Sequence, residues 1–211
     1  MPPAPIDRRT ALRLATLFMA GTAAGVARAQ ASPVAQIQRL CATLLKIMRM
    51  GRSTSFEQRF QVLAPVVDQV FDLQAVLEVS VGPTWRDMPP AQQAVLQAAF
   101  RRYTVASYVN SFNNFTGQRF DVSPETRTLG NGDQVVQSKI VPPSGDSHSL
   151  DYVMHEDEGD WKVVDVLADG SISRVAVQRS DFRRLLMRGG APALAASLQQ
   201  KTVDLGGGAG R

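Results

Sequence analysis

The sequence predicts an α+β protein with one main domain, in which helices come first, strands follow and helices return at the C-terminus. Up to Gly117, apolar residues recur every three or four positions, which is typical of amphipathic helices. From Arg119 to Ala168 the spacing changes to two, and short polar turns separate the segments, which indicates antiparallel strands. Helices and strands that are grouped rather than alternating favour the α+β class.

The first half of the chain after residue 30 is expected to form four helices. Ser, Asp and Pro are favoured where helices begin, and Gly is favoured where they end. The predicted helices run from Ser32-Pro33 to Gly51, from Ser55 with a break or kink at Pro65, from Asp72 to Val79, and from Pro89-Pro90 to about Phe115, with Gly117 as the stop.

The second half is expected to contain four strands and two short helices. Gly130-Asn131-Gly132-Asp133 is a strong hairpin signal, and an acidic turn at 156–160 separates the last two strands. The predicted strands are 119–128, 134–141, 147–155 and 161–168, and the predicted helices are 180–188 and 192–203, separated by Gly189-Gly190.

The first 29 residues predict a cleaved export signal. Twin arginines, Arg8-Arg9, precede a short apolar run that ends at Ala27-Arg28-Ala29, a small-x-small cleavage pattern. The run is too short for a membrane-spanning helix of ~20 apolar residues, and the paired arginines favour twin-arginine export. We therefore expect a single soluble periplasmic domain at 30–205, followed by a disordered glycine-rich tail at 206–211.

The charge of the chain gives no support for nucleic-acid binding, and its cysteine content excludes an internal disulfide. Without the signal, 19 basic residues stand against 18 acidic ones, so the basic isoelectric point of the whole chain is no argument for nucleic-acid binding. Cys41 is the only cysteine, so no intramolecular disulfide can form. Its position in an apolar helical stripe predicts a buried thiol.

The sequence predicts neither a metal site nor a cofactor site. The two histidines, His148 and His155, are seven residues apart in one predicted strand, which places them on opposite faces. The acidic run 156–160 lacks the alternating ligands of a calcium loop and is expected to be a solvated turn. The sequence also lacks a phosphate loop, a dinucleotide fingerprint and a nucleophile elbow.

The predicted strand 161–168 is apolar on both faces. One face carries Trp161, Val163, Asp165 and Leu167, and the other carries Lys162, Val164, Val166 and Ala168. A sheet with one solvated face would alternate more cleanly between apolar and polar residues. Either helices cover both sides of this strand, or one side lines a cavity.

An ordered string of motifs lies between Asp151 and Leu186. It reads Asp151-Tyr152-Val153-Met154, Gly159-Asp160-Trp161-Lys162-Val163-Val164-Asp165-Val166, Asp169-Gly170-Ser171-Ile172-Ser173 and Gln178-Arg179-Ser180-Asp181-Phe182-Arg183-Arg184-Leu185-Leu186. This string resembles the MlaC-like family, also known as toluene-tolerance or auxiliary ABC-transport proteins. Within the family, the segment 175–182 is most similar to the hopanoid-associated branch, HpnM.

The resemblance implies a curved antiparallel sheet of about four strands, wrapped by N- and C-terminal helices around an apolar cavity, similar to an NTF2-like cone. It implies a periplasmic carrier rather than an enzyme, without a cofactor, that holds a phospholipid or a hopanoid. Its expected partners are an inner-membrane transporter complex and an outer-membrane acceptor. Contact with membranes is expected to be transient, and no nucleic-acid partner is expected.

The candidate lipid-binding residues combine the apolar patterns with this resemblance, and ordinary core packing is the alternative for each of them. They are Phe71, Trp85, Phe100, Tyr103, Phe112, Tyr152, Val164, Val166 and Ile172. Arg59 and Arg179 resemble arginines of the family and are candidates for contact with a polar head group. The alternative is that each arginine pairs with a carboxylate, for example Asp68, Asp72 or Asp181, and holds helices together.

Two other classes of function remain open from the sequence. If Asp165 and Tyr152 face one apolar cavity, they could act as an acid–base pair of an isomerase or dehydratase on a terpenoid. Alternatively, Asp165 could be a structural hydrogen-bond acceptor at the corner after its strand. A cavity-free interaction module is the other class, with Arg183, Arg184 and Arg188 on a surface that could dock a partner.

Overall fold

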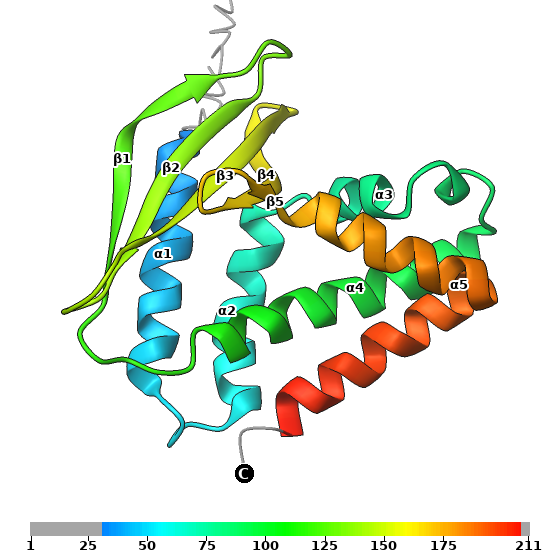
Figure 1. The fold of residues 1–211 in the computed structure, drawn as a ribbon, viewed down its shortest axis with the longest axis horizontal. Helices are drawn as coiled ribbons and strands as arrows, with labels where there is room; N and C mark the ends of the chain where they lie inside the picture. The colour runs from blue at the N-terminus through cyan, green and yellow to red at the C-terminus, as the bar shows by residue number, and fades with distance from the viewer. Residues whose placement is uncertain (1–30, 208–211) are drawn as a thin grey trace, which may run out of the picture.

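The computed structural model describes residues 31–207, so the predicted export signal and residues 208–211 of the predicted tail lie outside the described range. Within this range the chain forms five α-helices, one short 3-10 helix and five strands (Figure 1). They are α1 (Pro33–Met50), α2 (Phe56–Val70), α3 (Leu73–Val81), η1 (Pro83–Trp85), α4 (Pro90–Ser111), β1 (Arg119–Thr128), β2 (Gln134–Val141), β3 (His148–Asp157), β4 (Asp160–Ala168), β5 (Ile172–Ser173) and α5 (Arg174–Gly207).

The five strands form one open antiparallel sheet in the order β1-β2-β3-β4-β5, so every strand pairs with its neighbours in the chain. α1 runs along β1 and β2, whereas α3, α4 and α5 extend away from the sheet (Figure 1). This arrangement confirms the predicted α+β class with its curved antiparallel sheet. The fifth strand, which the sequence did not predict, is only two residues long.

The helix starts follow from local chemistry. The Ser32 hydroxyl accepts a hydrogen bond from the Ala35 amide at the start of α1, and the Asp72 carboxylate accepts one from the Ala75 amide at the start of α3. Ser55 and Gln58 form a reciprocal capping box at the start of α2. Each cap satisfies amide groups that have no partner within the helix itself, which explains why these starts could be predicted.

One predicted helix boundary is wrong, and one of two alternatives at Pro65 is excluded. α2 continues through Pro65, so the predicted break does not occur, whereas the alternative of a kink stays a prediction. Pro65 is exposed, and the carbonyl of Gln61 that loses its partner also lies in an exposed residue and can be hydrated. α4 ends at Ser111, four residues before the predicted end, because Phe112 leaves the helical conformation (φ −111°, ψ 56°) and turns its ring into the interior.

The C-terminal helix also differs from its prediction. α5 begins at Arg174 rather than 180, and its last turn includes Gly206 and Gly207, two residues of the predicted tail. The predicted interruption at Gly189-Gly190 is confirmed, since both residues leave the helical conformation and Gly190 has a φ of +63°, which glycine adopts readily. The two halves of α5 fold back on one another beside α4 (Figure 1).

A β-bulge in β4 changes the faces predicted for this strand. Val153 pairs with Asp165, but the next residue, Met154, pairs with Val163, so Val164 is an extra residue without a partner. Consequently Val163 and Val166 lie on the same side of the sheet, and the strict alternation predicted from the sequence is wrong.

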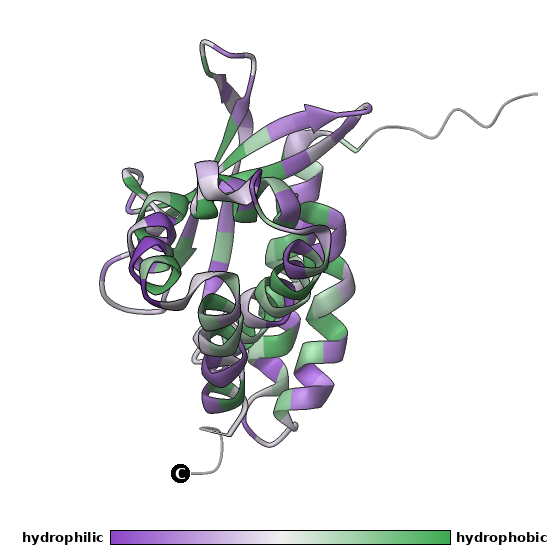
Figure 2. Ribbon diagram, turned by 90° about the vertical axis from the view of Figure 1, so that its right-hand side faces the viewer, coloured by the Kyte–Doolittle hydropathy of each residue, from purple (hydrophilic) through white to green (hydrophobic). Residues whose placement is uncertain are grey.

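The buried residues form two separate hydrophobic cores. The first core lies between the sheet, α1, α2 and the second half of α4, and it includes Cys41 as predicted. The second core lies between α3, η1, the first half of α4 and α5. Figure 2 shows hydrophobic and hydrophilic residues alternating along the helices, as expected for helices buried on one side. α4 contributes fully buried residues to both cores.

A hydrogen bond between the His155 ring and Asp133 joins β3 to the β1–β2 turn, with 2.7 Å between Nδ1 and Oδ1. This bond raises the pKa of His155, so its stabilising effect is complete below the usual histidine pKa of ~6.5 and disappears as pH rises through the raised value. We predict that His155→Gln lowers the free energy of unfolding by up to about 1 kcal/mol near pH 6, since His155 is largely exposed.

The difference between wild type and His155→Gln should shrink as pH rises to 9, as measured by urea unfolding at several pH values. His148→Gln is the matched control, because His148 lies in the same strand and forms no side-chain hydrogen bond among the described residues. A difference that grows with pH would contradict the prediction.

Candidate binding pocket

A cavity of about 420 Å³ lies between the two cores. Its walls come from α4, the β2–β4 part of the sheet, the α2–α3 connection and the start of α5. Its lining residues are Phe71, Leu73, Val76, Phe100, Tyr103, Thr104, Ser107, Tyr108, Ser111, Phe112, Ile140, His148, Leu150, Val163, Asp165, Val166, Ala168, Arg174, Val175 and Gln178. A volume of this size is within the range of small-molecule binding sites, ~300–1,000 Å³.

One face of α4 forms the longest wall. Its lining residues fall at spacings of three and four, so they share one side of the helix. Aromatic residues stand at both ends of this stripe, and the small residues Thr104, Ser107 and Ser111 lie between them. Side chains of this size do not fill the space that the aromatic rings hold open, which explains why a cavity forms here.

The opposite wall is anchored where the α2–α3 connection meets β4. Phe71 forms an isolated parallel bridge with Val163, and the amide of Asp72 donates a 3.0 Å hydrogen bond to the Val163 carbonyl. The Lys162 ammonium donates to the Gln69 carbonyl at 2.6 Å. These bonds fix Phe71 against the strand, and the bulge turns both Val163 and Val166 toward the cavity.

Aromatic contacts hold the wall near the end of α4. The Phe71 ring meets Tyr108 edge-on with centroids 5.7 Å apart, and Tyr108 stacks on Phe112 at 5.9 Å. Burial raises the pKa of Tyr108 above the usual tyrosine value, and the nearby charge of Arg174 offsets part of that rise. The phenol is therefore neutral at all physiological pH values and acts as part of an apolar wall.

The carboxylate of Asp165 is already engaged within the protein. Its oxygens accept hydrogen bonds from the amides of Val166 (2.7 Å) and Val175 (3.1 Å) and from the Ser173 hydroxyl. The Ser173 hydroxyl in turn accepts from the Ala176 amide. Asp165 therefore closes the corner between β4 and α5, which is the structural alternative that the sequence left open.

The predicted acid–base pair of Asp165 and Tyr152 is not assembled. Tyr152 pairs with Val166 across the sheet and Asp165 pairs with Val153, so neighbouring positions turn the two side chains to opposite sides. Tyr152 is fully buried in the first core and is not among the residues that line the cavity. Burial raises the pKa of Tyr152 well above its ordinary value, and its hydroxyl has no partner among the described residues.

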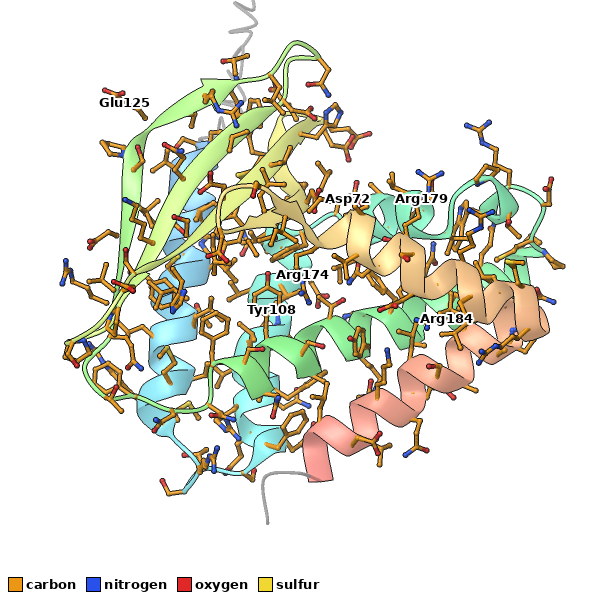
Figure 3. The ribbon with its side chains drawn as sticks, viewed as in Figure 1. Asp72, Tyr108, Glu125, Arg174, Arg179 and Arg184 are labelled. Atoms are coloured by element: carbon orange, nitrogen blue, oxygen red, sulfur yellow. The ribbon has the colours of Figure 1, made fainter. Side chains whose placement is uncertain are left out.

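Polar residues gather at the rim of the cavity. Ser111, His148 and Arg174 line it and are exposed, whereas Phe71, Phe100 and Phe112 are buried. Figure 3 shows Arg174 at the start of α5, close to Tyr108 on α4. Arg174 has no carboxylate within ion-pair distance in the part of the chain that the structure describes. The cavity therefore has an apolar interior and a polar opening.

Five of the predicted lining residues are brought together around this cavity, namely Phe71, Phe100, Tyr103, Phe112 and Val166. The other four are not among its lining residues. Trp85 is buried in the second core, where it anchors its loop, and Tyr152 is buried in the first core. Val164 is turned away by the bulge, and Ile172 is exposed on the two-residue strand β5.

Neither of the predicted head-group arginines lines the cavity. Arg59 is only 1% exposed, and its guanidinium donates to the Val109 carbonyl at 3.3 Å. That carbonyl lies in the last turn of α4, where it lacks a helical partner and carries the negative end of the helix dipole. Arg179 is exposed beside Gly82, and its side chain lies near α3 (Figure 3).

The alternative ion pairs suggested for these arginines are also not formed. Asp68 pairs with Arg101 at 2.6 Å, and Asp181 pairs with Arg184 at 2.8 Å on the same helix. Asp72 caps α3. Arg59 therefore holds α2 to α4 through a backbone carbonyl rather than through a carboxylate.

Sequence reasoning missed most of the polar lining. The α4 periodicity continues from Phe100 through Thr104, Ser107 and Ser111, so the same spacing that indicated the helix could have assigned these residues to the cavity face. His148 and Arg174 come from distant segments that meet only in the folded chain, and the sequence carries no local signal for their proximity.

Between residues 31 and 207, no group of three or more His, Cys, Asp and Glu side chains is placed to hold a metal ion. In the same part of the chain, no helix combines the length and apolarity needed to cross a membrane.

An apolar cavity with a polar rim, in an α+β fold, has the chemistry of a site for an amphipathic small molecule. Comparison with known proteins identifies the family. The model of the MlaC protein family matches residues 38–200, and the chain therefore belongs to the MlaC family. No curated protein matches the chain.

A solved structure has a similar fold. It is the phospholipid-binding protein from Ralstonia solanacearum in complex with a phospholipid, with a TM-score of 0.70 and 22% sequence identity. The match covers 84% of this chain and 99% of the Ralstonia protein. At 22% sequence identity, this likeness shows that the two proteins share a fold and nothing more.

The three hydrogen bonds to Asp165 lead to a stability prediction. Asp165→Asn replaces one acceptor oxygen by an amide donor, so the Ser173 hydroxyl loses its charged partner. We expect the free energy of unfolding to fall by about 1–3 kcal/mol, the range for hydrogen bonds to charged groups, as measured by urea unfolding. Asp169→Asn, four residues away and exposed, is the control and should change stability little. Equal stability of the two variants would contradict the role of Asp165 at this corner.

Proposed function

We propose that the protein is a soluble periplasmic carrier that holds a phospholipid or a hopanoid in the cavity between its two cores and shuttles it between membranes. The observation that carries this proposal is the 420 Å³ cavity, with aromatic and aliphatic walls and a polar rim. Membership of the MlaC family and the phospholipid bound to the Ralstonia protein support the same ligand class.

Such a carrier needs only to bury the apolar part of its lipid, and it needs no reacting group. Exposing a methylene group to water costs ~0.8 kcal/mol, so a sixteen-carbon acyl chain resists crossing an aqueous compartment by roughly 12 kcal/mol. A deep apolar cavity removes most of this barrier without any reacting group. The engaged carboxylate of Asp165 and the separation of Asp165 from Tyr152 favour binding over an acid–base reaction.

The predicted export signal at residues 1–29 and the family support a periplasmic location for this carrier. Its docking partners are an inner-membrane transporter complex and an outer-membrane acceptor, and membrane contact is transient. The likeness of 175–182 to the HpnM branch makes a hopanoid a candidate cargo beside phospholipids.

Native mass spectrometry tests the carrier function directly. The full chain is expressed in a Gram-negative host, and the protein is purified from the periplasmic extract without detergent. We expect a one-to-one adduct that dissociates as a lipid, because an empty apolar cavity of this size would fill from the membrane. A bare mass that stays bare after incubation with phospholipid vesicles and a hopanoid extract would overturn the proposal.

A second experiment tests the export route. Replacing Arg8 and Arg9 together by lysine should abolish periplasmic accumulation, because the twin-arginine pathway depends on that pair, whereas Arg13→Lys is the matched control in the same segment. The readout is cell fractionation followed by immunoblotting. Normal export of the double variant would assign the protein to the general secretory route and refute the twin-arginine prediction.

A further inference from the structure

A second hollow adjoins the cavity on the outer side of the α2–α3 connection. It is an open groove of about 860 Å³ between α3, the first half of α4 and the β3–β4 hairpin. Phe71 and Leu73 line both the cavity and this groove, so residues 71–73 form a wall between the two spaces, here named the linker wall. Leu73 is only partly buried, although it lies against both cores. Atoms that face free space on two sides lack the packing contacts that hold an ordinary core residue in place.

Small side chains leave the groove behind the linker wall open. Ala75 lines it from α3, and Ala94 and Ala98 line it from α4. Ala94 and Ala98 are four residues apart, so they share one side of the helix, and both are exposed. The linker wall therefore has space on its outer side, into which it can move without displacing a packed core.

Few bonds hold the linker wall in place. The Asp72 amide donates to the Val163 carbonyl at 3.0 Å, and the Lys162 ammonium donates to the Gln69 carbonyl at 2.6 Å. The Lys162 bond is exposed, so water competes for both of its partners and its net contribution is small. The pairing of Phe71 with Val163 is an isolated bridge rather than part of a strand ladder. The closed position of the linker wall therefore depends mainly on this bridge and on the packing of the Phe71 ring.

The other walls of the cavity are held by more contacts. α4 packs in both cores, and β2, β3 and β4 are joined by ladders of backbone hydrogen bonds. The start of α5 is fixed by hydrogen bonds to Asp165. Cargo that is bulkier than the closed cavity has to displace a wall, and this costs free energy for each packing contact that is lost. The linker wall loses the least when it moves, because it moves into open space.

We propose that the linker wall moves outward into the groove, so that the cavity encloses lipids with two acyl chains or a polycyclic skeleton. This inference rests on the proposed carrier function, and it explains how one cavity serves both classes of cargo. The displaced side chains of Phe71 and Leu73 come to lie between the alanines of α3 and α4, where their apolar surface is again covered. A lipid with a single chain has less apolar bulk and leaves the linker wall in its closed position.

Filling the groove tests this movement. Ala98→Phe places a ring behind the linker wall, and the cavity itself is unchanged because Ala98 is not among its lining residues. The probes are vesicles of dipalmitoyl phosphatidylglycerol, a dispersed hopanoid and micelles of palmitoyl lysophosphatidylglycerol. Delipidated protein is incubated with each probe over a range of concentrations, and native mass spectrometry measures the bound fraction.

The variant should discriminate between lipids by their bulk. We expect Ala98→Phe to weaken binding of the two-chain lipid and of the hopanoid at least about tenfold, or ~1.4 kcal/mol. Binding of the single-chain lysolipid should stay within about twofold of wild type. Ala91→Phe is the matched control, because Ala91 is exposed on the same helix and lines neither the cavity nor the groove. This control should bind all three lipids as wild type does.

Hydrogen exchange follows the movement in the wild-type protein. Outward movement breaks the bond between the Asp72 amide and the Val163 carbonyl. We therefore expect the Asp72 amide to exchange at least about tenfold faster in protein loaded with the two-chain lipid than in empty protein, as measured by NMR. Loading with the lysolipid should leave this rate unchanged. The Gly82 amide, which donates to the Glu78 carbonyl at the other end of α3, is the reference and should exchange at the same rate in all samples.

The outcomes separate this inference from the proposed function. If folded Ala98→Phe binds the two-chain lipid and the hopanoid as wild type does, or loses the lysolipid equally, the movable wall is refuted and the carrier function stands. An Asp72 amide that is equally protected in empty and loaded wild type refutes it as well, and this measurement decides the matter if the variant does not fold. If wild type binds only the lysolipid, the inference also fails. If wild type binds none of the three probes, both the inference and the proposed function fail.

Discussion

α4 packs in two hydrophobic cores at once, and the cavity exists because these cores stay apart along its length. The second half of the helix contributes Val105, Ala106 and Val109 to the core beneath the sheet, and the first half contributes Leu96, Ala99 and Phe100 to the core with α3 and α5. Between them the helix presents small hydroxyl residues to the space that the aromatic side chains hold open. Because densely packed cores resist deformation, a gap fixed between two of them keeps its width.

β4 gives this gap its second wall, and two local irregularities make that possible. The extra residue at Val164 turns Val163 and Val166 toward the same side, which widens the apolar surface of a narrow strand. The corner after the strand would expose the first amides of α5, and Asp165 with Ser173 satisfies them. The carboxylate at the cavity edge is thereby used to hold the corner between β4 and α5.

The arginines show why a charged residue needs its tertiary surroundings before a role is assigned. Arg59 is buried and donates to a carbonyl at the end of α4, so its charge interacts with a helix terminus. Arg174 has no such partner in the described part of the chain and stands at the cavity rim, where the polar end of an amphipathic ligand would lie. Arg59 and Arg174 have the same side chain, and only their positions in the folded protein distinguish their roles.

The sequence by itself determined the α+β class, the helix starts at Ser32, Ser55 and Asp72, the hairpin turns and the interruption at Gly189-Gly190, because these depend on contacts within a few residues. Of the nine residues that the sequence predicted to bind lipid, five line the cavity in the structure. The tertiary structure alone decided the bulge in β4, the end of α4 at Phe112, the corner at Asp165 and the rim of His148 and Arg174. Each of these depends on groups far apart in the chain, and no local propensity encodes which distant partner will satisfy a buried amide or fill an apolar space.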